Sequence, residues 1–270
     1  MSALTLAGRP TIRVTQLRVF RSEWTKLRSV RSTYWSLFVT LLLIIGIGIL
    51  VCVIFEVRWS HLAAHQRDDF HRLRVNLAGV NFAQLAIGVL GVLVITAEYS
   101  TGMIRATFSA VPKRLPVLWA KTIVFAAVAF LLTLPAIFIV FFAGQSVLAG
   151  QHINISISHP GVVRALFGAA LYLMVMGVFG LGLGAIFRST AGGISALAAI
   201  VFVLPPIIGL FPASFANSVD PYLPSNAGGA VWTISPKAHT LAPWAGFAVF
   251  CGYVIASIVI AAVLMVRRDA

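Results

Sequence analysis

Three long runs of uncharged residues constrain this chain more than any other feature. Residues 34–55, 75–97 and 165–187 contain no acidic or basic side chain. A helix rises about 1.5 Å per residue, so roughly 20 residues cross a bilayer core about 30 Å thick. Each run is therefore long enough to form a membrane-spanning helix.

The composition agrees with a chain whose natural solvent is lipid. The 270 residues are 60% hydrophobic and only 10% charged, whereas soluble domains carry about 25% charged residues. The net charge of +13 could indicate a nucleic-acid partner. The basic residues mostly flank the apolar runs, however, which favours a role in membrane orientation and no nucleic-acid binding.

The hydrophobic pattern predicts an all-α, polytopic membrane protein. We expect a tail and connecting helix over 1–33 and a transmembrane domain over 34–270. The six expected spans are at about 34–56, 76–97, 117–147, 162–187, 190–211 and 244–266. Prolines should bend the third span near Pro135 and kink or end the fifth at Pro205 and Pro206. The stretch 211–243 is too polar to span and predicts an interfacial or re-entrant element. Within the fourth span, Gly180 and Gly184 have the spacing that lets helices pack closely.

The distribution of basic residues predicts which side each loop occupies. With both termini inside, fourteen basic residues are cytoplasmic and six lie outside, at 58, 67, 72, 74, 164 and 237. Because cytoplasmic loops carry an excess of lysine and arginine, this orientation is favoured. We therefore expect a multi-pass protein of a prokaryotic cytoplasmic membrane, with cytoplasmic N- and C-termini.

An amphipathic segment precedes the first span. Apolar residues recur there at helical spacing, with basic residues on other faces: Leu17, Phe20, Trp24, Leu27 and Tyr34 against Arg18, Arg21, Lys26 and Arg28. Such a helix should lie in the cytoplasmic membrane interface, where anionic lipid attracts the cations. The alternative is a basic flank that only orients the first span.

The segment after the second span carries the most information. Glu98 ends an uncharged run, and an acidic residue at that place predicts a specific polar or cationic partner. Met103, Ile104, Thr107 and Phe108 then form a short apolar face, before Pro112 and a basic exit. A short amphipathic helix of this kind suits a groove on another protein. The alternative is a loop helix lying on lipid.

This segment, EYSTGMIRATFSAVPKR over 98–114, resembles the cytoplasmic coupling region of the ABC transporter type-2 permease family, actinobacterial-like in character. The lead-in LRVFRSEWTKLRSVRSTYW and the stretch DPYLPSNAGGAVW resemble that family less specifically. The resemblance covers nearly the whole chain in layout but only these segments in sequence. The positions that match the family motif are Glu98, Gly102, Arg105 and Thr107.

The resemblance implies a membrane subunit of an ATP-driven exporter without an ATPase site of its own. Two ABC ATPase subunits would bind ATP and Mg, and a second permease subunit, identical or homologous, would complete the complex. The coupling helix would comprise Glu98, Tyr99, Gly102, Met103, Ile104, Arg105, Thr107 and Phe108, and the connecting helix Leu17, Arg18, Phe20, Arg21, Trp24, Lys26, Leu27 and Arg28. A hydrophobic or amphiphilic cargo, such as a drug, peptide antibiotic or lipid, suits spans with few ionisable residues.

Other functions stay open at this point. A secondary transporter or channel needs an intramembrane ionisable site, and this sequence has no acidic residue at mid-depth. A non-transporting partner of an ATPase, for immunity or sensing, would have much the same sequence.

No phosphate-binding loop or catalytic residue is expected, and hence no enzyme. His61, His65 and His71, with Asp68 and Asp69, have ligand-like spacing, but neighbouring arginines favour a solvated loop over a metal site.

Overall fold

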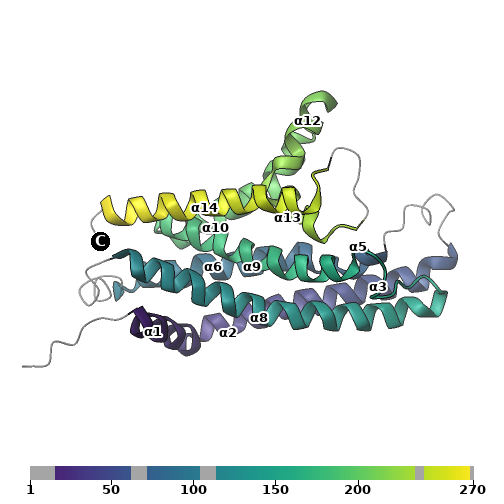
Figure 1. Cartoon of the computed structure of the whole chain (residues 1–270), viewed down its shortest axis with the longest axis horizontal. Helices are drawn as coiled ribbons and strands as arrows, with labels where there is room; N and C mark the ends of the chain where they lie inside the picture. The colour runs from purple at the N-terminus through teal and green to yellow at the C-terminus, as the bar shows by residue number, and fades with distance from the viewer. Residues whose placement is uncertain (1–15, 62–71, 104–113, 235–239, 268–270) are drawn as a thin grey trace, which may run out of the picture.

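The computed structural model describes residues 16–61, 72–103, 114–234 and 240–267, and over these ranges the chain is helical without strands. Six helices are long and apolar enough to cross a membrane: Arg31–His61, Val80–Ser100, Leu115–Gln151, Val162–Phe187, Thr190–Ile208 and Pro243–Arg267. This confirms the predicted all-α fold with six candidate spans. The long helices run side by side along the longest axis of the molecule (Figure 1).

The first span is built from four consecutive helical segments. α2 (Arg31–Leu42) passes into a π-helical turn, η1 (Leu43–Ile47), and then into α3 (Gly48–Arg58) and η2 (Trp59–His61). A short helix, α5 (Arg72–Asn76), precedes the second span, α6 (Val80–Ser100). The second span therefore begins later than predicted, because buried Asn76 ends α5 and its amide donates to the Val140 carbonyl at 3.1 Å.

The third and fourth spans are long and form the middle of the bundle. α8 (Arg114–Leu148) continues unbroken through Pro135 and is followed by η3 (Ala149–Gln151). α9 (Val162–Phe187) lies centrally and contacts α6, α8, α10 and α14. The burial of α9 agrees with its central position, because 78% of its most apolar stretch of 18 residues is inside the protein.

Close packing of α6 on α9 depends on the predicted glycines. A Cβ at Gly180 would overlap the backbone carbonyl of Gly88, and one at Gly184 would lie 2.7 Å from the Ile95 side chain. A Cβ at Gly91 would likewise overlap the Gly177 carbonyl. The packing role predicted for Gly180 and Gly184 is confirmed, and α6 supplies complementary glycines of its own.

The fifth span is the least buried and changes helical register in its middle. α10 (Thr190–Ala198) passes through a π turn, η4 (Ala199–Val203), into α11 (Leu204–Ile208). Pro205 and Pro206 do not end the helix, which continues to Ile208. Neither proline has a backbone N–H to donate to the preceding turn. That preceding turn is the π turn η4, in which the hydrogen-bond spacing differs from that of an α-helix. The span ends at Ile208, before Gly209 and Pro212.

The stretch after the fifth span is helical in pieces. α12 (Ala213–Val219) stands away from the bundle in Figure 1, followed by η5 (Asp220–Tyr222), α13 (Pro224–Gly229) and η6 (Ala230–Trp232). α13 and η6 pack on α9 and α14 (Pro243–Arg267), and Arg164 donates to the carbonyls of Val231 and Thr233, both at 3.1 Å. α1 (Gln16–Ser29) lies at the same end of the molecule as the C-terminal end of α14 (Figure 1).

Candidate functional site

Four charged side chains from three helices meet at the end of the bundle where α1 lies. They are Glu23 and Lys26 of α1, Glu98 of α6 and Lys121 of α8. We call them the ion cluster. Their formal charges sum to zero, which matters because an isolated charge is costly to bury, whereas a paired and hydrogen-bonded charge is tolerated.

Lys121 is the most enclosed cation of the ion cluster. Its Nζ lies 2.5 Å from Glu23 Oε2 and 2.8 Å from Glu98 Oε1, and the residue is only 3% exposed. Burial of an ammonium group is tolerated when carboxylates replace its lost water. The pairing therefore ties the start of α8 to both α1 and α6.

Lys26 is the more exposed of the two cations in the ion cluster. Its Nζ lies 2.7 Å from Glu23 Oε1 and 2.9 Å from Glu98 Oε1. Partial burial by itself lowers the pKa of Lys26, but the hydrogen bonds and charges of Glu23 and Glu98 outweigh burial and raise its pKa above 10.5. Lys26 is thus a firmly charged second partner for both carboxylates.

The packing around the ion cluster explains why α1 presents these residues. Val19 is buried against Val117 and Ala120 of α8, with Phe20 alongside. Glu23 lies one turn further along the same face of α1, so the helix carries its acidic side chain to Lys121. The buried face of α1 therefore carries Glu23 beside Val19, while Leu17 and Trp24 are exposed together with Arg18, Arg21 and Arg28.

Next to Glu98, Tyr99 links the same end of α6 to two further helices. The guanidinium of Arg188 lies 5.3 Å from the centre of the Tyr99 ring, a cation–π distance. Arg188 ends α9 in a left-handed conformation (φ 51°) and donates to the Leu264 carbonyl of α14 at 3.2 Å. Thr190 at the start of α10 donates to Thr96 of α6 at 2.9 Å. The end of α6 is thereby connected to α1, α8, α9, α10 and α14.

The residues predicted for the coupling helix are only partly within the described ranges. Glu98 is buried in the ion cluster, Tyr99 is half-buried, and Gly102 and Met103 are exposed, Gly102 with a φ of 70°. Ile104, Arg105, Thr107 and Phe108 lie outside the described residues. Glu98 and Tyr99 belong to the last turn of α6, and the left-handed Gly102 separates them from Met103, so the prediction that they are part of a coupling helix is wrong. A coupling helix beyond Gly102 stays a prediction. The predicted polar or cationic partner of Glu98 is confirmed as Lys26 and Lys121 of its own chain.

The residues predicted for the connecting helix all lie on α1. Phe20, Lys26 and Leu27 are half-buried, and the rest of the set is exposed: Leu17, Arg18, Arg21, Trp24 and Arg28. The helix itself is confirmed. Its location in a membrane interface stays a prediction, because it concerns the surroundings of the chain.

The sequence analysis did not identify two members of the ion cluster, Glu23 and Lys121. Both stand out in the sequence as isolated charges. Glu23 is the one acidic residue before Glu56, and Lys121 is the one charged residue between Arg114 and Arg164. A lone charge within an apolar or oppositely charged stretch implies a partner elsewhere in the fold. The sequence does not say which partner, because the two residues are far apart along the chain.

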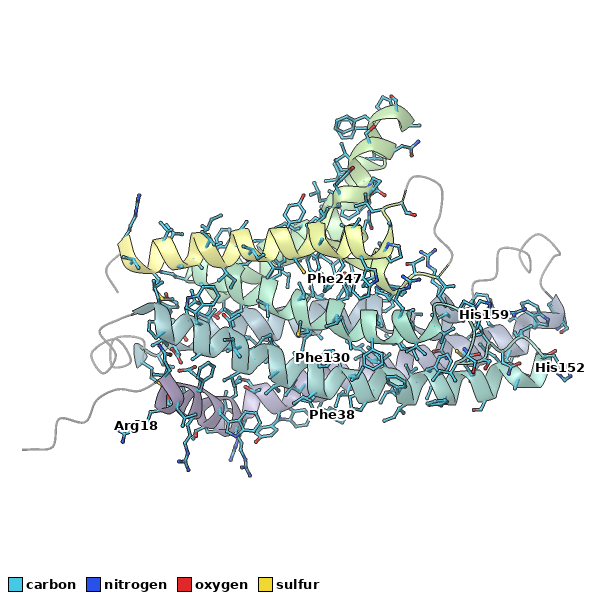
Figure 2. The ribbon with its side chains drawn as sticks, in the orientation of Figure 1. Arg18, Phe38, Phe130, His152, His159 and Phe247 are labelled. Atoms are coloured by element: carbon cyan, nitrogen blue, oxygen red, sulfur yellow. The ribbon has the colours of Figure 1, made fainter. Side chains whose placement is uncertain are left out.

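No metal site is evident in the described part of the chain, where no three histidine, cysteine or acidic side chains come together as a possible ligand group. Of the predicted ligand-like residues, His61 is described and exposed, while His65, His71, Asp68 and Asp69 lie outside the described ranges. His152 and His159 lie at the end of the bundle far from α1 (Figure 2).

Comparison with models of known protein families gives no match for the chain, and comparison with curated proteins gives none either. The fold and the ion cluster define a class, that of multi-pass helical membrane proteins with a charged junction at one end of the bundle.

Proposed function

We propose that this chain is the membrane-spanning permease subunit of an ATP-driven ABC exporter. Two separate ATPase subunits bind ATP and Mg, and a second permease subunit, identical or homologous, completes the complex. The protein resides in a prokaryotic cytoplasmic membrane with both ends in the cytoplasm. The cargo is hydrophobic or amphiphilic: a drug, a peptide antibiotic or a lipid.

One observation carries the proposal: the ion cluster lies where the segment resembling a coupling helix leaves α6. Glu98 is the first residue of that segment and pairs with Lys26 at 2.9 Å and Lys121 at 2.8 Å. A displacement of the segment by an ATPase would therefore reach α1 and α8 directly, through charge-assisted hydrogen bonds. Tyr99 and Arg188 extend the same connection toward α9 and α14.

The mechanism is conformational and needs no covalent chemistry by this chain. Closure of the ATPases on ATP pushes the coupling segment, and the ion cluster moves the adjoining ends of α1, α6 and α8 together. Rigid packed helices transmit such a shift because their contacts have discrete arrangements and do not deform continuously. Movement at the far end of the spans then opens a path to the outside.

Within the spans, the buried polar groups of the described residues are neutral away from the helix ends. Gln84 accepts a hydrogen bond from the Tyr172 hydroxyl, and both side chains are buried. Ion- or proton-driven transporters use ionisable groups at mid-depth. Neutral pairs of this kind support a transporter that is driven from one end by a partner.

The test is co-purification with any candidate ATPases encoded beside the gene, followed by ATPase assays in lipid. Replacing Met103, Ile104 and Phe108 together with serine should abolish association, because the apolar face of the coupling segment is lost. Replacing exposed Leu210, Phe211 and Phe215 near α12 in the same way is the matched control, and association should persist. Transport by the purified chain alone, without any ATPase, would contradict the proposal and favour a secondary transporter or channel.

A further inference from the structure

The face of α1 opposite the ion cluster combines exposed aromatic and basic residues. Leu17 is 78% exposed and Trp24 50% exposed, and Tyr34 and Trp35 follow at the start of α2 with 53% and 69% exposed. Arg18, Arg21 and Arg28 are exposed beside them. Arg18 points away from the bundle in Figure 2.

Helical geometry separates this face into two adjacent stripes. Residues seven apart differ by only about 20° around a helix of 3.6 residues per turn, so Leu17 lies above Trp24 and Arg21 above Arg28. The arginine stripe is about 40° from the apolar stripe, since four residues separate Trp24 from Arg28. An apolar stripe bordered by cations is the pattern of a helix lying in the headgroup region, with its apolar side toward the acyl chains.

The arginines on this face have no acidic partner within the described ranges. The acidic residue of α1, Glu23, is turned to the opposite side and paired with Lys26 and Lys121. Among the described residues, no carboxylate forms an ion pair with Arg18, Arg21 or Arg28. The three guanidinium groups are therefore available to an external anion.

We propose that this face of α1, formed by Leu17, Arg18, Arg21, Trp24 and Arg28, binds the headgroups of anionic phospholipids. Arginine donates paired hydrogen bonds to phosphate oxygens, and its long side chain reaches the headgroup while the helix stays at the interface. Charge complementarity selects anionic over zwitterionic lipid, because each basic residue near an anionic surface gains attraction.

Lipid binding on one face of α1 also stabilises the docking of the other. A ligand that binds the docked helix and not the detached one shifts the equilibrium toward docking. The lipid face and the ion cluster occupy opposite sides of a single short helix, so anionic lipid should hold Glu23 and Lys26 in place against α6 and α8. The lipid proposal concerns the chain alone and stands whether or not an ATPase partner exists.

The test uses the purified full-length chain in nanodiscs of phosphatidylcholine alone, or of equal parts phosphatidylcholine and phosphatidylglycerol. Retention of labelled phosphatidylglycerol and the thermal unfolding midpoint are measured for the wild type and for Arg18→Gln/Arg21→Gln/Arg28→Gln. At about one kcal/mol per basic residue, the triple variant should bind phosphatidylglycerol on the order of a hundredfold more weakly. It should also lose the increase in midpoint that anionic lipid gives the wild type.

A matched control removes the same charge at the opposite end of the bundle, where Arg58, Arg72 and Arg74 are also exposed. Arg58→Gln/Arg72→Gln/Arg74→Gln should keep the anionic-lipid effect. Raising the salt concentration should weaken the binding of the wild type, because these charges are exposed and are screened. Unchanged phosphatidylglycerol retention in the α1 triple variant would overturn the proposal. A triple variant that retained the lipid but lost an ATPase partner would assign the arginines to that protein instead.

Discussion

We predict that Lys121 is essential to the stability of the ion cluster. Replacing it with methionine keeps the apolar stem but removes the 2.5 Å contact to Glu23 and the 2.8 Å contact to Glu98. Both carboxylates are nearly inaccessible, at 2% and 6% exposed, and Lys26 is then the one cation left for two negative charges. Breaking a buried ion pair by removing one partner costs about 3–5 kcal/mol, and we expect Lys121→Met to lose that much free energy of unfolding.

A double-mutant cycle separates pairing from other effects. Glu23→Gln/Lys121→Met leaves Glu98 and Lys26 as a balanced pair, so its loss of stability should be smaller than the sum of the two single losses by roughly 1–3 kcal/mol. The measurement is equilibrium unfolding in mixed micelles. Arg58→Met, an exposed cation at the other end of the bundle, should change the stability by less than about 0.5 kcal/mol.

Two results would refute the reasoning. If Lys121→Met cost no more than Arg58→Met, the cluster would not be the buried, tightly paired site described above. If the losses of Glu23→Gln and Lys121→Met were additive, the two residues would not interact energetically. A stable Lys121→Met variant would also weaken the proposed function, because the connection from the coupling segment to α8 would be dispensable.

Two further predictions concern helix packing and alkaline pH. Gly91→Ala should destabilise the bundle by about 1–3 kcal/mol, because its Cβ would overlap the Gly177 carbonyl; the control Gly252→Ala meets no atom within 4 Å and should be neutral or stabilising in the same unfolding assay. Lys26 has a raised pKa in the folded protein, so its contribution to stability is complete below pH 10.5 and is lost as the pH rises through the higher folded value. The stability difference between wild type and Lys26→Met, measured across this range, should therefore stay constant at neutral pH and shrink only in strong alkali; a difference that vanished near neutrality would contradict this assignment.

The spans were predictable because their signal is local. Whether residues 165–187 can cross a bilayer depends on their own length and apolarity, and α9 accordingly begins and ends at the predicted residues. The start of the second span was not predictable in the same way, because α5 ends where Asn76 meets the backbone of α8, far along the chain. Likewise, Pro205 and Pro206 signalled a disturbance of the fifth span, but only the structure shows that a π turn accommodates them.

The sequence by itself determined that this chain is a helical, six-span bundle, and it marked Glu98 as a residue in need of a partner. The tertiary structure alone decided that the partners are Lys26 and Lys121, and that Glu23 joins them. It also decided that α1 buries Glu23 beside Val19 and exposes Leu17 and Trp24 together with its three arginines. The physical reason is that length and apolarity are properties of a segment, whereas the pairing of buried charges depends on which helices meet. In lipid an apolar face gains little from burial in protein, so a face of a helix that carries an acidic side chain can be the one that packs.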